Sequence, residues 1–269
     1  MMWFVLLVMC FCEVQEVPAD TLKVSDIQHD EGHINSLKSG QPNLRIPSET
    51  ALDFEEDYAV QEGDLLLPSD RNAVNQLWPG VDGHLPVPYE IDSALESRTE
   101  DILKALNMIS EKTCIEFLPH TKETDYLHFE KSNGCASYVG CMGGEQPVLV
   151  GPHCKVGNIC HEVLHALGLH HEHSRFDRGD HITIVYENIV SGKEDNFMKK
   201  EGNTLGLKYD LESILHYGDK YFSRNGKPTI LPKESGVKLG QRAYLSDLDV
   251  QKLRKLYHCD KKEGDQAAS

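Results

Sequence analysis

The chain has 269 residues, of which 39% are hydrophobic, and it carries a formal net charge of −16. This length is enough for one sizeable folded domain and an N-terminal extension. The negative charge and the scattered Lys and Arg residues exclude the basic surface with which proteins bind nucleic acid, so we expect no nucleic-acid partner.

An apolar run covers the N-terminus from Met1 to Cys12 and ends at Glu13. It is too short to span a bilayer, and its length is typical of the core of a secretory signal peptide. A buried N-terminal helix is the alternative interpretation. We expect a signal peptide over residues 1–19, with cleavage after Ala19, and export to the extracellular space, by way of secretory granules. No later segment is apolar enough to cross a membrane, so we expect no membrane partner.

The next segment is polar and acidic. Residues 1–71 carry 4 Lys and Arg against 14 Asp and Glu, a net charge of −10, whereas residues 72–269 carry only −6. A segment with so few hydrophobic residues in a regular pattern cannot bury a core of its own. We therefore expect residues 20–71 to be a propeptide that wraps the following domain. An activating protease is expected to cleave near Arg71, its predicted end.

Residues 72–269 have the pattern of one globular domain. Four short strands are predicted, at residues 87–91, 114–118, 126–129 and 147–150. Three helices are predicted, over residues 92–110, over residues 156–167 and from Ser246 onward. Ser246 and Asp249 resemble a capping box, and Gly168 is a stop signal for the second helix. Residues 171–245 are loop-rich. Helices and strands without regular alternation predict an α+β fold.

The chain has 8 cysteines, of which Cys10 and Cys12 are expected to leave with the signal peptide. The remaining six stand at positions 114, 135, 141, 154, 160 and 259. An even number in a secreted chain indicates three disulfides, and 15 pairings of six cysteines are possible. Reduced thiols or a structural metal site are the alternatives, but no CxxC pair supports a metal site.

Residues 161–171 contain the pattern HExxHxxGxxH. On a helix, His161 and His165 lie one turn apart on the same face, so both imidazoles can reach one ion. A continued helix would place His171 about 15 Å further along the axis, so the helix must end first, and Gly168 permits the turn. Three histidine ligands leave the fourth position of tetrahedral zinc to water, which is typical of a catalytic site. We therefore predict one Zn²⁺ per chain.

Glu162 follows the first predicted ligand and cannot easily bind the same ion. It can accept a proton from the attacking water and pass it to the leaving group, so we predict it to be the general base. The pattern has a chance probability on the order of 10⁻⁴ with this composition. An amphipathic helix with surface histidines is the alternative. His170 and His173 fit no ligand position and are interpreted as ordinary histidines.

The string HEVLHALGLHHEHSRFDR at residues 161–178 resembles the metzincins, and the astacin family in particular. The likeness covers nearly all of residues 72–259, including EKTCIEF around Cys114 and SILHYG at 213–218. EGDLLLPSDRNA and LGQR are closest to the fish hatching-enzyme type. The resemblance implies a monomeric zinc endopeptidase domain over residues 72–269. It also implies a twisted, mainly parallel sheet with the zinc-binding helix in an N-terminal subdomain, and a loop-rich C-terminal subdomain that ends in a helix.

The resemblance also implies disulfide pairs. It pairs Cys114 with Cys259 and Cys135 with Cys154. Two cysteines then remain, so by elimination we expect a third disulfide between Cys141 and Cys160, which would brace the start of the zinc-binding helix.

Roles for three further residues follow from the same resemblance. Tyr217 takes the position of a switchable fifth zinc ligand that hydrogen-bonds the transition-state oxyanion. Glu172 takes the position that pairs with the freed N-terminus of the mature enzyme. Asp64 takes that of a propeptide aspartate that occupies the water position and keeps the precursor inactive. A packed tyrosine and a simple turn residue are the alternatives for Tyr217 and Asp64.

Two departures from the family pattern bear on function. Leu215 stands where the family has a methionine below the zinc, and Gln61 stands where the propeptide motif begins with an aromatic residue. Leu has a volume similar to Met, so we expect zinc to be retained. We expect protein substrates, and the likeness to the hatching-enzyme type favours egg-envelope proteins among them. A protease with another tissue role and a catalytically impaired, secreted binding protein are the alternatives.

Overall fold

The computed structural model describes residues 60–67, 77–80 and 84–260. The predicted signal peptide, Arg71 and most of the predicted propeptide lie outside the described residues. No helix in the described ranges is both long and apolar enough to cross a membrane.

A seven-stranded sheet, with strand order β1-β2-β6-β7-β5-β3-β4, is the main structural layer. In chain order its strands are β1 (Val60–Gln61), β2 (Leu65–Leu66), β3 (Leu85–Ile91), β4 (Ile115–Pro119), β5 (Tyr126–Lys131), β6 (Cys135–Ser137) and β7 (Glu145–Val150). The four longest strands are those that the sequence predicts, and they run parallel as neighbours. β6 is antiparallel to β7, and β2 pairs with the other edge of β6.

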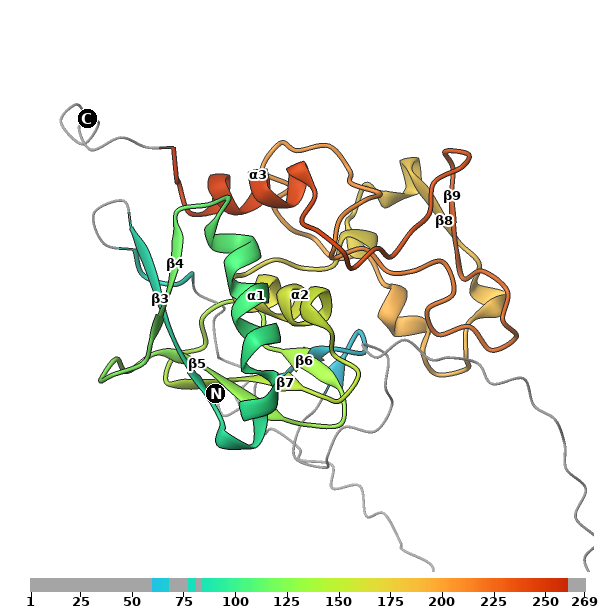
Figure 1. The fold of residues 1–269 in the computed structure, drawn as a ribbon. Coiled ribbons are helices and arrows are strands. Elements are labelled where there is room, and N and C mark those ends of the chain that lie inside the picture. The colour runs from blue at the N-terminus through green and yellow to red at the C-terminus, as the bar shows by residue number, and fades with distance from the viewer. Residues whose placement is uncertain (1–59, 68–76, 81–83, 261–269) are drawn as a thin grey trace, which may run out of the picture. The chain divides into compact units, whose positions relative to one another are not determined.

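Two helices lie against one face of this sheet (Figure 1), α1 (Thr99–Ser110) and α2 (Val156–Ala166). The first predicted helix begins instead as a 3-10 helix, η2 (Ser93–Arg98), which is capped by the Asp92 carboxylate through a hydrogen bond of 2.6 Å from the Ala94 N–H. Alternate residues of the strands face the helices, and this inner set forms the core with them: Val87, Leu127, Phe129, Val148 and Val150. The prediction of an α+β fold with a mainly parallel sheet is confirmed.

Most of residues 171–245 are loops, as predicted, with one small sheet and several single turns of 3-10 helix. The sheet pairs β8 (Ile182–Ile184) with β9 (Ile230–Pro232) in antiparallel fashion. The 3-10 helices are η3 (Glu172–Ser174), η4 (Arg178–Asp180), η5 (Tyr186–Asn188) and η6 (Glu194–Phe197). Phe197 and Tyr217 belong to a second hydrophobic cluster, separate from the core under the sheet. This loop-rich part therefore has its own packed centre.

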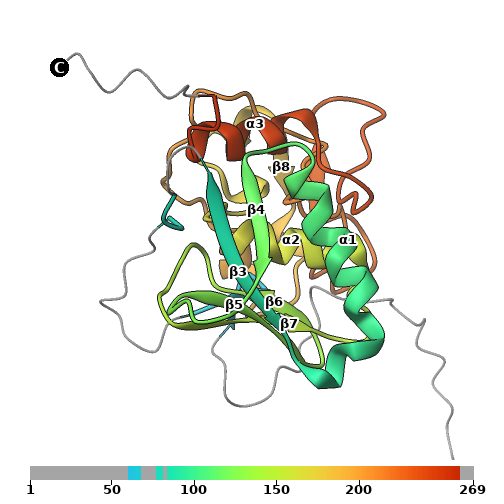
Figure 2. The same ribbon diagram turned by 60° about the vertical axis from the view of Figure 1, so that its left-hand side comes forward.

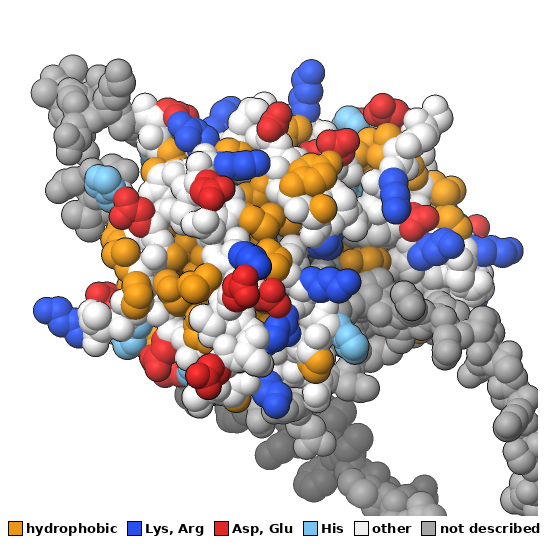
Figure 3. Space-filling view, in the orientation of Figure 1, with side chains coloured by type: hydrophobic (Ala, Val, Ile, Leu, Met, Phe, Trp, Pro, Cys, Tyr) orange, Lys and Arg blue, Asp and Glu red, His pale blue; other side chains and the backbone are white. Residues whose placement is uncertain are grey.

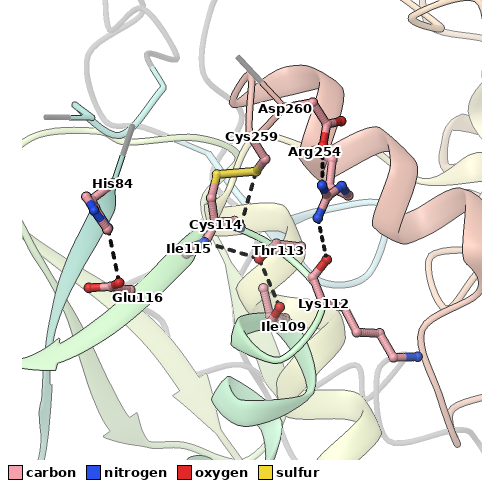
Figure 4. Close-up of a disulfide and its surroundings, with 10 residues drawn as sticks. All are labelled: His84, Ile109, Lys112, Thr113, Cys114, Ile115, Glu116, Arg254, Cys259 and Asp260. Atoms are coloured by element: carbon pink, nitrogen blue, oxygen red, sulfur yellow. Dashed lines mark hydrogen bonds and ion pairs between the residues drawn. A yellow bond between two sulfur atoms is a disulfide. The ribbon is translucent and has the colours of Figure 1, made fainter. Parts of the chain in front are cut away.

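Helix α3 (Asp247–Leu256) comes last and lies at the end of the molecule where β4 begins (Figures 1 and 2). Its N-terminus has the predicted capping box, because the Ser246 hydroxyl accepts from the Asp249 N–H and the Asp249 carboxylate accepts from the Ser246 N–H. The predicted Cys114–Cys259 disulfide ties the end of α3 to the start of β4 (Figure 4). The predicted Cys135–Cys154 disulfide is also present.

The predicted Cys141–Cys160 disulfide is wrong, because both residues are free, buried thiols in the structure. Cys160 lies near Asp249 of α3, whereas Cys141 lies beside Asp125 and Gly143. Burial raises the pKa of both thiols. Each packs into the main hydrophobic core as a small apolar side chain. The third disulfide was expected on the assumption that every cysteine of the domain is paired, but a buried cysteine can also remain a free thiol.

The face seen in Figure 3 mixes acidic and basic side chains, with apolar side chains gathered over β3, β4 and α1. A shallow groove in this region is lined by Tyr89, Leu103, Leu106 and Phe117. None of its lining residues belongs to α2, so it is not part of the site that α2 carries.

Candidate zinc centre

The three predicted histidine ligands converge. Helix α2 ends at Ala166, and Gly168 has a φ of 97°, which turns the chain back toward the helix. The Nε2 atoms of His161 and His165 lie 3.0 Å apart, and that of His171 lies 3.3 and 3.2 Å from them. Nitrogens about 2.05 Å from a tetrahedral ion are separated by roughly 3.3 Å. The three nitrogens are therefore spaced as three corners of a zinc tetrahedron.

The other nitrogen of each ring faces a hydrogen-bond acceptor. Nδ1 of His161 lies 2.8 Å from the Ile214 carbonyl oxygen, and Nδ1 of His165 lies 2.7 Å from the Leu169 carbonyl oxygen. Nδ1 of His171 lies 2.7 Å from a carboxylate oxygen of Glu62. Because Nδ1 is the donor in each ring, Nε2 presents a lone pair to the common centre. The orientation of all three rings suits a metal ion.

Asp64 completes the cluster. Its Oδ2 atom lies 3.2 Å from Nε2 of both His161 and His171, and its Oδ1 atom has no hydrogen-bond partner. The side chain is only 1% exposed. A buried carboxylate oxygen without a partner is costly unless a cation or another donor satisfies it. The four residues thus fit one zinc ion, with Asp64 at the fourth corner.

A second possible ligand group is not buried. His128, Glu130 and Glu145 lie together on the outer face of β5 and β7. The 2.6 Å hydrogen bond between His128 Nδ1 and Glu145 accounts for the arrangement without an ion. Exposed clusters of this kind are common without a metal, so we assign none to it.

The electrostatics of the buried cluster favour a positive charge at its centre. Burial and the neighbouring rings of His171 and His161 lower the pKa of His165 well below its usual value, so this ring is neutral as a ligand must be. Burial acts in the same direction on His171, but the carboxylates of Asp64 and Glu62 outweigh it and raise its pKa to about 9. A bound zinc ion can supply the positive charge that these carboxylates attract.

Glu162 is fully buried on α2. Its backbone carbonyl accepts a hydrogen bond of 2.7 Å from the Ser137 hydroxyl, which fixes α2 to strand β6. The N–H of Ser137 in turn donates to the Asp64 carbonyl at 3.0 Å. Strand β6 therefore holds both the zinc-binding helix and the segment that carries Asp64. The role of Glu162 as general base stays a prediction.

Glu62 is a site residue that the sequence did not reveal. Its carboxylate is 1% exposed and contacts His171 Nδ1 at 2.7 Å and the Lys200 ammonium at 2.5 Å. Its backbone carbonyl accepts a hydrogen bond from the Tyr217 hydroxyl. The positive φ angles of Glu62 (53°) and Gly63 (81°) let Glu62 and Asp64 both face the histidines. The only sequence signal was the glycine between two acidic residues.

Tyr217 lies beside the cluster, as the resemblance implied. Its ring stacks on His173 at a centroid distance of 3.6 Å and meets the His171 ring edge to face at 4.8 Å. His173 is fully buried, and its Nε2 lies 2.9 Å from the Asn196 carbonyl oxygen. His173 does not belong to the group of four converging residues, but it supports the tyrosine, which the sequence did not indicate. The function of Tyr217 as an oxyanion donor stays a prediction.

Glu172 is 1% exposed, and the structure gives it partners within the chain. It accepts from the Asp210 N–H at 2.8 Å and from the Arg175 guanidinium at 3.0 Å, and it pairs with the Lys252 ammonium. Asn72, the predicted mature N-terminus, lies outside the described residues. The predicted pairing between that terminus and Glu172 therefore stays a prediction.

Leu215 is fully buried in the main hydrophobic core. The backbone around it supports His161 and the residue that follows His171, since the Ile214 carbonyl accepts from His161 and the Leu215 carbonyl accepts from the Glu172 N–H at 3.1 Å. These contacts use backbone atoms, so they do not require a methionine side chain at this position.

Comparisons with known proteins agree with this geometry. Residues 70–258 match the family model described as Astacin, a family of peptidases. The chain is 40% identical over 210 residues to the low choriolytic enzyme of Oryzias latipes, which covers 74% of this chain and 78% of that protein. It is 40% identical over 220 residues to zinc metalloproteinase nas-4 of Caenorhabditis elegans, which covers 74% of this chain and 69% of that protein.

Other relatives are longer than this chain. Zinc metalloproteinase nas-13 of Caenorhabditis elegans is 42% identical over 195 residues, and the match covers 70% of this chain but 43% of that protein. Among solved structures, high choriolytic enzyme 1, a hatching-enzyme zinc protease from Oryzias latipes, matches with a TM-score of 0.66 and 35% identity. That match covers 68% of this chain and 94% of the solved one.

Proposed function

The chain belongs to the astacin family of zinc metalloendopeptidases, and on that premise we propose that it is a secreted protease made as an inactive precursor. In this proposal residues 1–19 are the signal peptide, residues 20–71 the propeptide and residues 72–269 the peptidase domain. An activating protease cleaves near Arg71. Family membership and the histidine cluster establish the zinc endopeptidase itself.

The observation that carries the proposal of a precursor is the position of residues 62–64. Asp64 lies where the fourth ligand of a bound zinc ion would be, and the Glu62 carbonyl accepts a hydrogen bond from the Tyr217 hydroxyl. Strand β2 pairs with the edge of β6 that faces away from β7. Strand β6 also holds the zinc-binding helix, through the hydrogen bond from the Ser137 hydroxyl to the Glu162 carbonyl. An extended substrate could pair with that same edge by strand addition. Residues 62–66 thus block the water position beside the histidines, the Tyr217 hydroxyl and the substrate-binding edge together.

Once residues 62–64 have left, the chain's own groups can carry out hydrolysis. Zinc, when bound, polarises the scissile carbonyl and makes water a stronger nucleophile. Glu162 removes a proton from the attacking water and delivers it to the leaving amine. The Tyr217 hydroxyl donates a hydrogen bond to the oxygen that becomes negative in the transition state.

The test compares the uncleaved precursor with protein processed at Arg71, using casein as a broad substrate. We expect only the processed protein to cleave casein, and a zinc chelator to abolish cleavage. Glu162→Gln is the matched control, because it should retain zinc and fold while losing roughly 10²–10⁴-fold in rate. Cleavage that resists the chelator, or an uncleaved precursor as active as the processed protein, would contradict the proposal.

We further propose egg-envelope proteins as the substrates, supported by the likeness to two choriolytic enzymes. Isolated egg envelopes should release soluble fragments with the processed protein and not with Glu162→Gln. Cleavage of casein without release of envelope fragments would favour another tissue role.

A further inference from the structure

Helix α2 ends between the second and the third zinc ligand, and the carbonyl groups of its last turn need hydrogen-bond partners there. A helix leaves its last four carbonyl oxygens without partners inside the helix. Backbone N–H groups satisfy three of them, those of Val163, Leu164 and His165. The fourth carbonyl, that of Ala166, and the next one, that of Leu167, receive no backbone hydrogen bond from the described residues. Both residues are fully buried, so water does not satisfy them either.

Two side chains from distant segments supply the missing donors. The indole N–H of Trp78 donates to the Ala166 carbonyl at 2.8 Å, and the Tyr257 hydroxyl donates to the Leu167 carbonyl at 2.9 Å. Trp78 lies near the start of the predicted peptidase domain, whereas Tyr257 follows the last helix, α3. Together they form a C-terminal cap for the zinc-binding helix, which many helices obtain from the residues that follow them directly.

The two capping side chains also support each other. Burial raises the pKa of Tyr257, and a hydrogen bond with the Trp78 backbone opposes this only in part, so the hydroxyl keeps its proton and remains a donor. Leu77 and Leu256 each precede one of these residues. Their side chains lie 3.2 and 3.7 Å from the position that a Cβ atom of Gly168 would take. The cap therefore closes over the residue at which the chain turns back.

Tyr257 is anchored within the peptidase domain. Its backbone N–H donates to the Leu253 carbonyl at 2.9 Å, and Cys259, two residues later, is bonded to Cys114 at the start of β4 (Figure 4). None of the contacts of the cap involves residues 60–67, the described part of the proposed propeptide. The cap can therefore persist when that segment leaves.

The turn that the cap fixes leads to two zinc ligands. The Leu169 carbonyl accepts from Nδ1 of His165 at 2.7 Å, and His171 follows two residues later. A shift of the Leu167 carbonyl would be passed to Leu169, because only Gly168 separates the two residues. Since the groups that orient the ligands tune how tightly a metal is held, a change in the cap should change zinc retention.

We propose that Trp78 and Tyr257 are positioning residues of the zinc centre, in the precursor and in the mature enzyme. Their hydrogen bonds to the end of α2 keep His165 and His171 in the geometry that binds zinc. This inference rests on the proposed function only in its zinc endopeptidase part. It connects both ends of the predicted peptidase domain to its centre, because the segment at Trp78 and the end of α3 act on the same helix.

The first experiment removes one hydroxyl and measures zinc retention. Tyr257→Phe deletes a single oxygen atom and leaves the Leu167 carbonyl without its donor. We expect mature Tyr257→Phe to release zinc to a chelator about three- to tenfold faster than the wild type, in keeping with the loss of one buried hydrogen bond. Tyr89→Phe is the matched control, because Tyr89 is half-buried against the same core and its hydroxyl bonds no described residue. Equal release rates for Tyr257→Phe and the wild type would overturn the inference.

The second experiment separates positioning from a general loss of stability. With an internally quenched peptide, Tyr257→Phe should lose about three- to tenfold in kcat at a KM within about twofold of the wild type. The absorption bands of cobalt-substituted Tyr257→Phe should shift, because they depend on ligand geometry, whereas those of Tyr89→Phe should not. A lower Tm together with wild-type zinc release, kcat and cobalt bands would show a purely structural role and overturn the inference.

The third experiment follows the cap through activation. Trp78 is the only tryptophan of residues 20–269, so tryptophan emission reports on this contact alone. We expect the precursor and the mature protein to have the same emission maximum and the same low quenching by acrylamide, since Trp78 is 3% exposed. A mature protein whose tryptophan is quenched as readily as in the unfolded chain would show that the cap opens, against the inference.

The outcomes also separate the inference from the proposed function. If no zinc-loaded, processed form cleaves any substrate, the proposed function fails, while zinc release and the cobalt bands still decide the role of the cap. If Tyr257→Phe does not fold, Trp78→Phe, which lacks the indole N–H, should show the same faster release of zinc.

Discussion

Glu62→Gln should release part of the inhibition in the uncleaved precursor. The Glu62 carboxylate is 1% exposed. It contacts the Lys200 ammonium at 2.5 Å and the Nδ1 atom of His171 at 2.7 Å. The contacts with His171 and Lys200 outweigh burial and lower its pKa to about 2, so it is charged at neutral pH. Breaking a buried ion pair by removing one charge costs about 3–5 kcal/mol.

The isosteric amide keeps some of the hydrogen bonds, so we expect the closed precursor to lose the lower end of that range of free energy, about 3 kcal/mol. Since about 1.4 kcal/mol corresponds to a factor of ten, the open fraction of the precursor should rise roughly 100-fold. Its residual activity should rise by the same factor, because only the open precursor can bind substrate.

The assay is hydrolysis of an internally quenched peptide by precursor that carries Arg71→Ala to prevent processing. Gln61→Ala is the matched control, since Gln61 is exposed and adjacent in the chain, and it should change activity by less than about twofold. Asp64→Asn provides the reference for a fully weakened precursor. If Asp64→Asn raises activity and Glu62→Gln does not, the contacts of Glu62 do not hold the precursor closed.

Three further changes test the fold and the site. Leu215→Met should change stability by less than about 1.5 kcal/mol and kcat/KM by less than about threefold; a tenfold gain in kcat/KM would mark Leu215 as a catalytic defect. Ellman's reagent should find no reactive thiol in the folded mature protein and two after unfolding without reductant, from Cys141 and Cys160; no thiol after unfolding would restore the third disulfide. Gly157→Ala should lower Tm sharply, since its Cβ would lie 1.8 Å from the Arg242 carbonyl oxygen, whereas Gly202→Ala meets nothing within 4 Å; equal Tm values would contradict this packing.

The parts of the fold that the sequence predicted depend on local signals. Helix α2 was recognisable because histidine spacing and Gly168 act within a few residues, and α3 because Ser246 and Asp249 form a capping box within one turn. The four parallel strands are long enough to show a hydrophobic pattern. β1, β2 and β6 have only two or three residues each and were missed, because such short strands exist only through their neighbours in the sheet.

The contacts that were missed join distant segments. Glu62 contacts residue 171 across 109 residues of chain and Lys252 contacts residue 172 across 80, and neither contact leaves a spacing to recognise. Cys141 and Cys160 were mispaired for a related reason, since free buried cysteines and disulfide cysteines look the same in a sequence. The residue types were visible to sequence analysis, but their partners depended on the tertiary fold.

The histidine contacts show which part of the zinc centre activation would alter. The Nδ1 partners of His161 and His165 are backbone carbonyls of the peptidase domain, so they remain after cleavage. The Nδ1 partner of His171 is Glu62, which would leave with the proposed propeptide. Among the three ligands, His171 would therefore be the one that loses its Nδ1 partner on activation. Because the partner of a ligand's second nitrogen fixes the ring orientation, the His171 ring should change its contacts more on activation than the rings of His161 and His165.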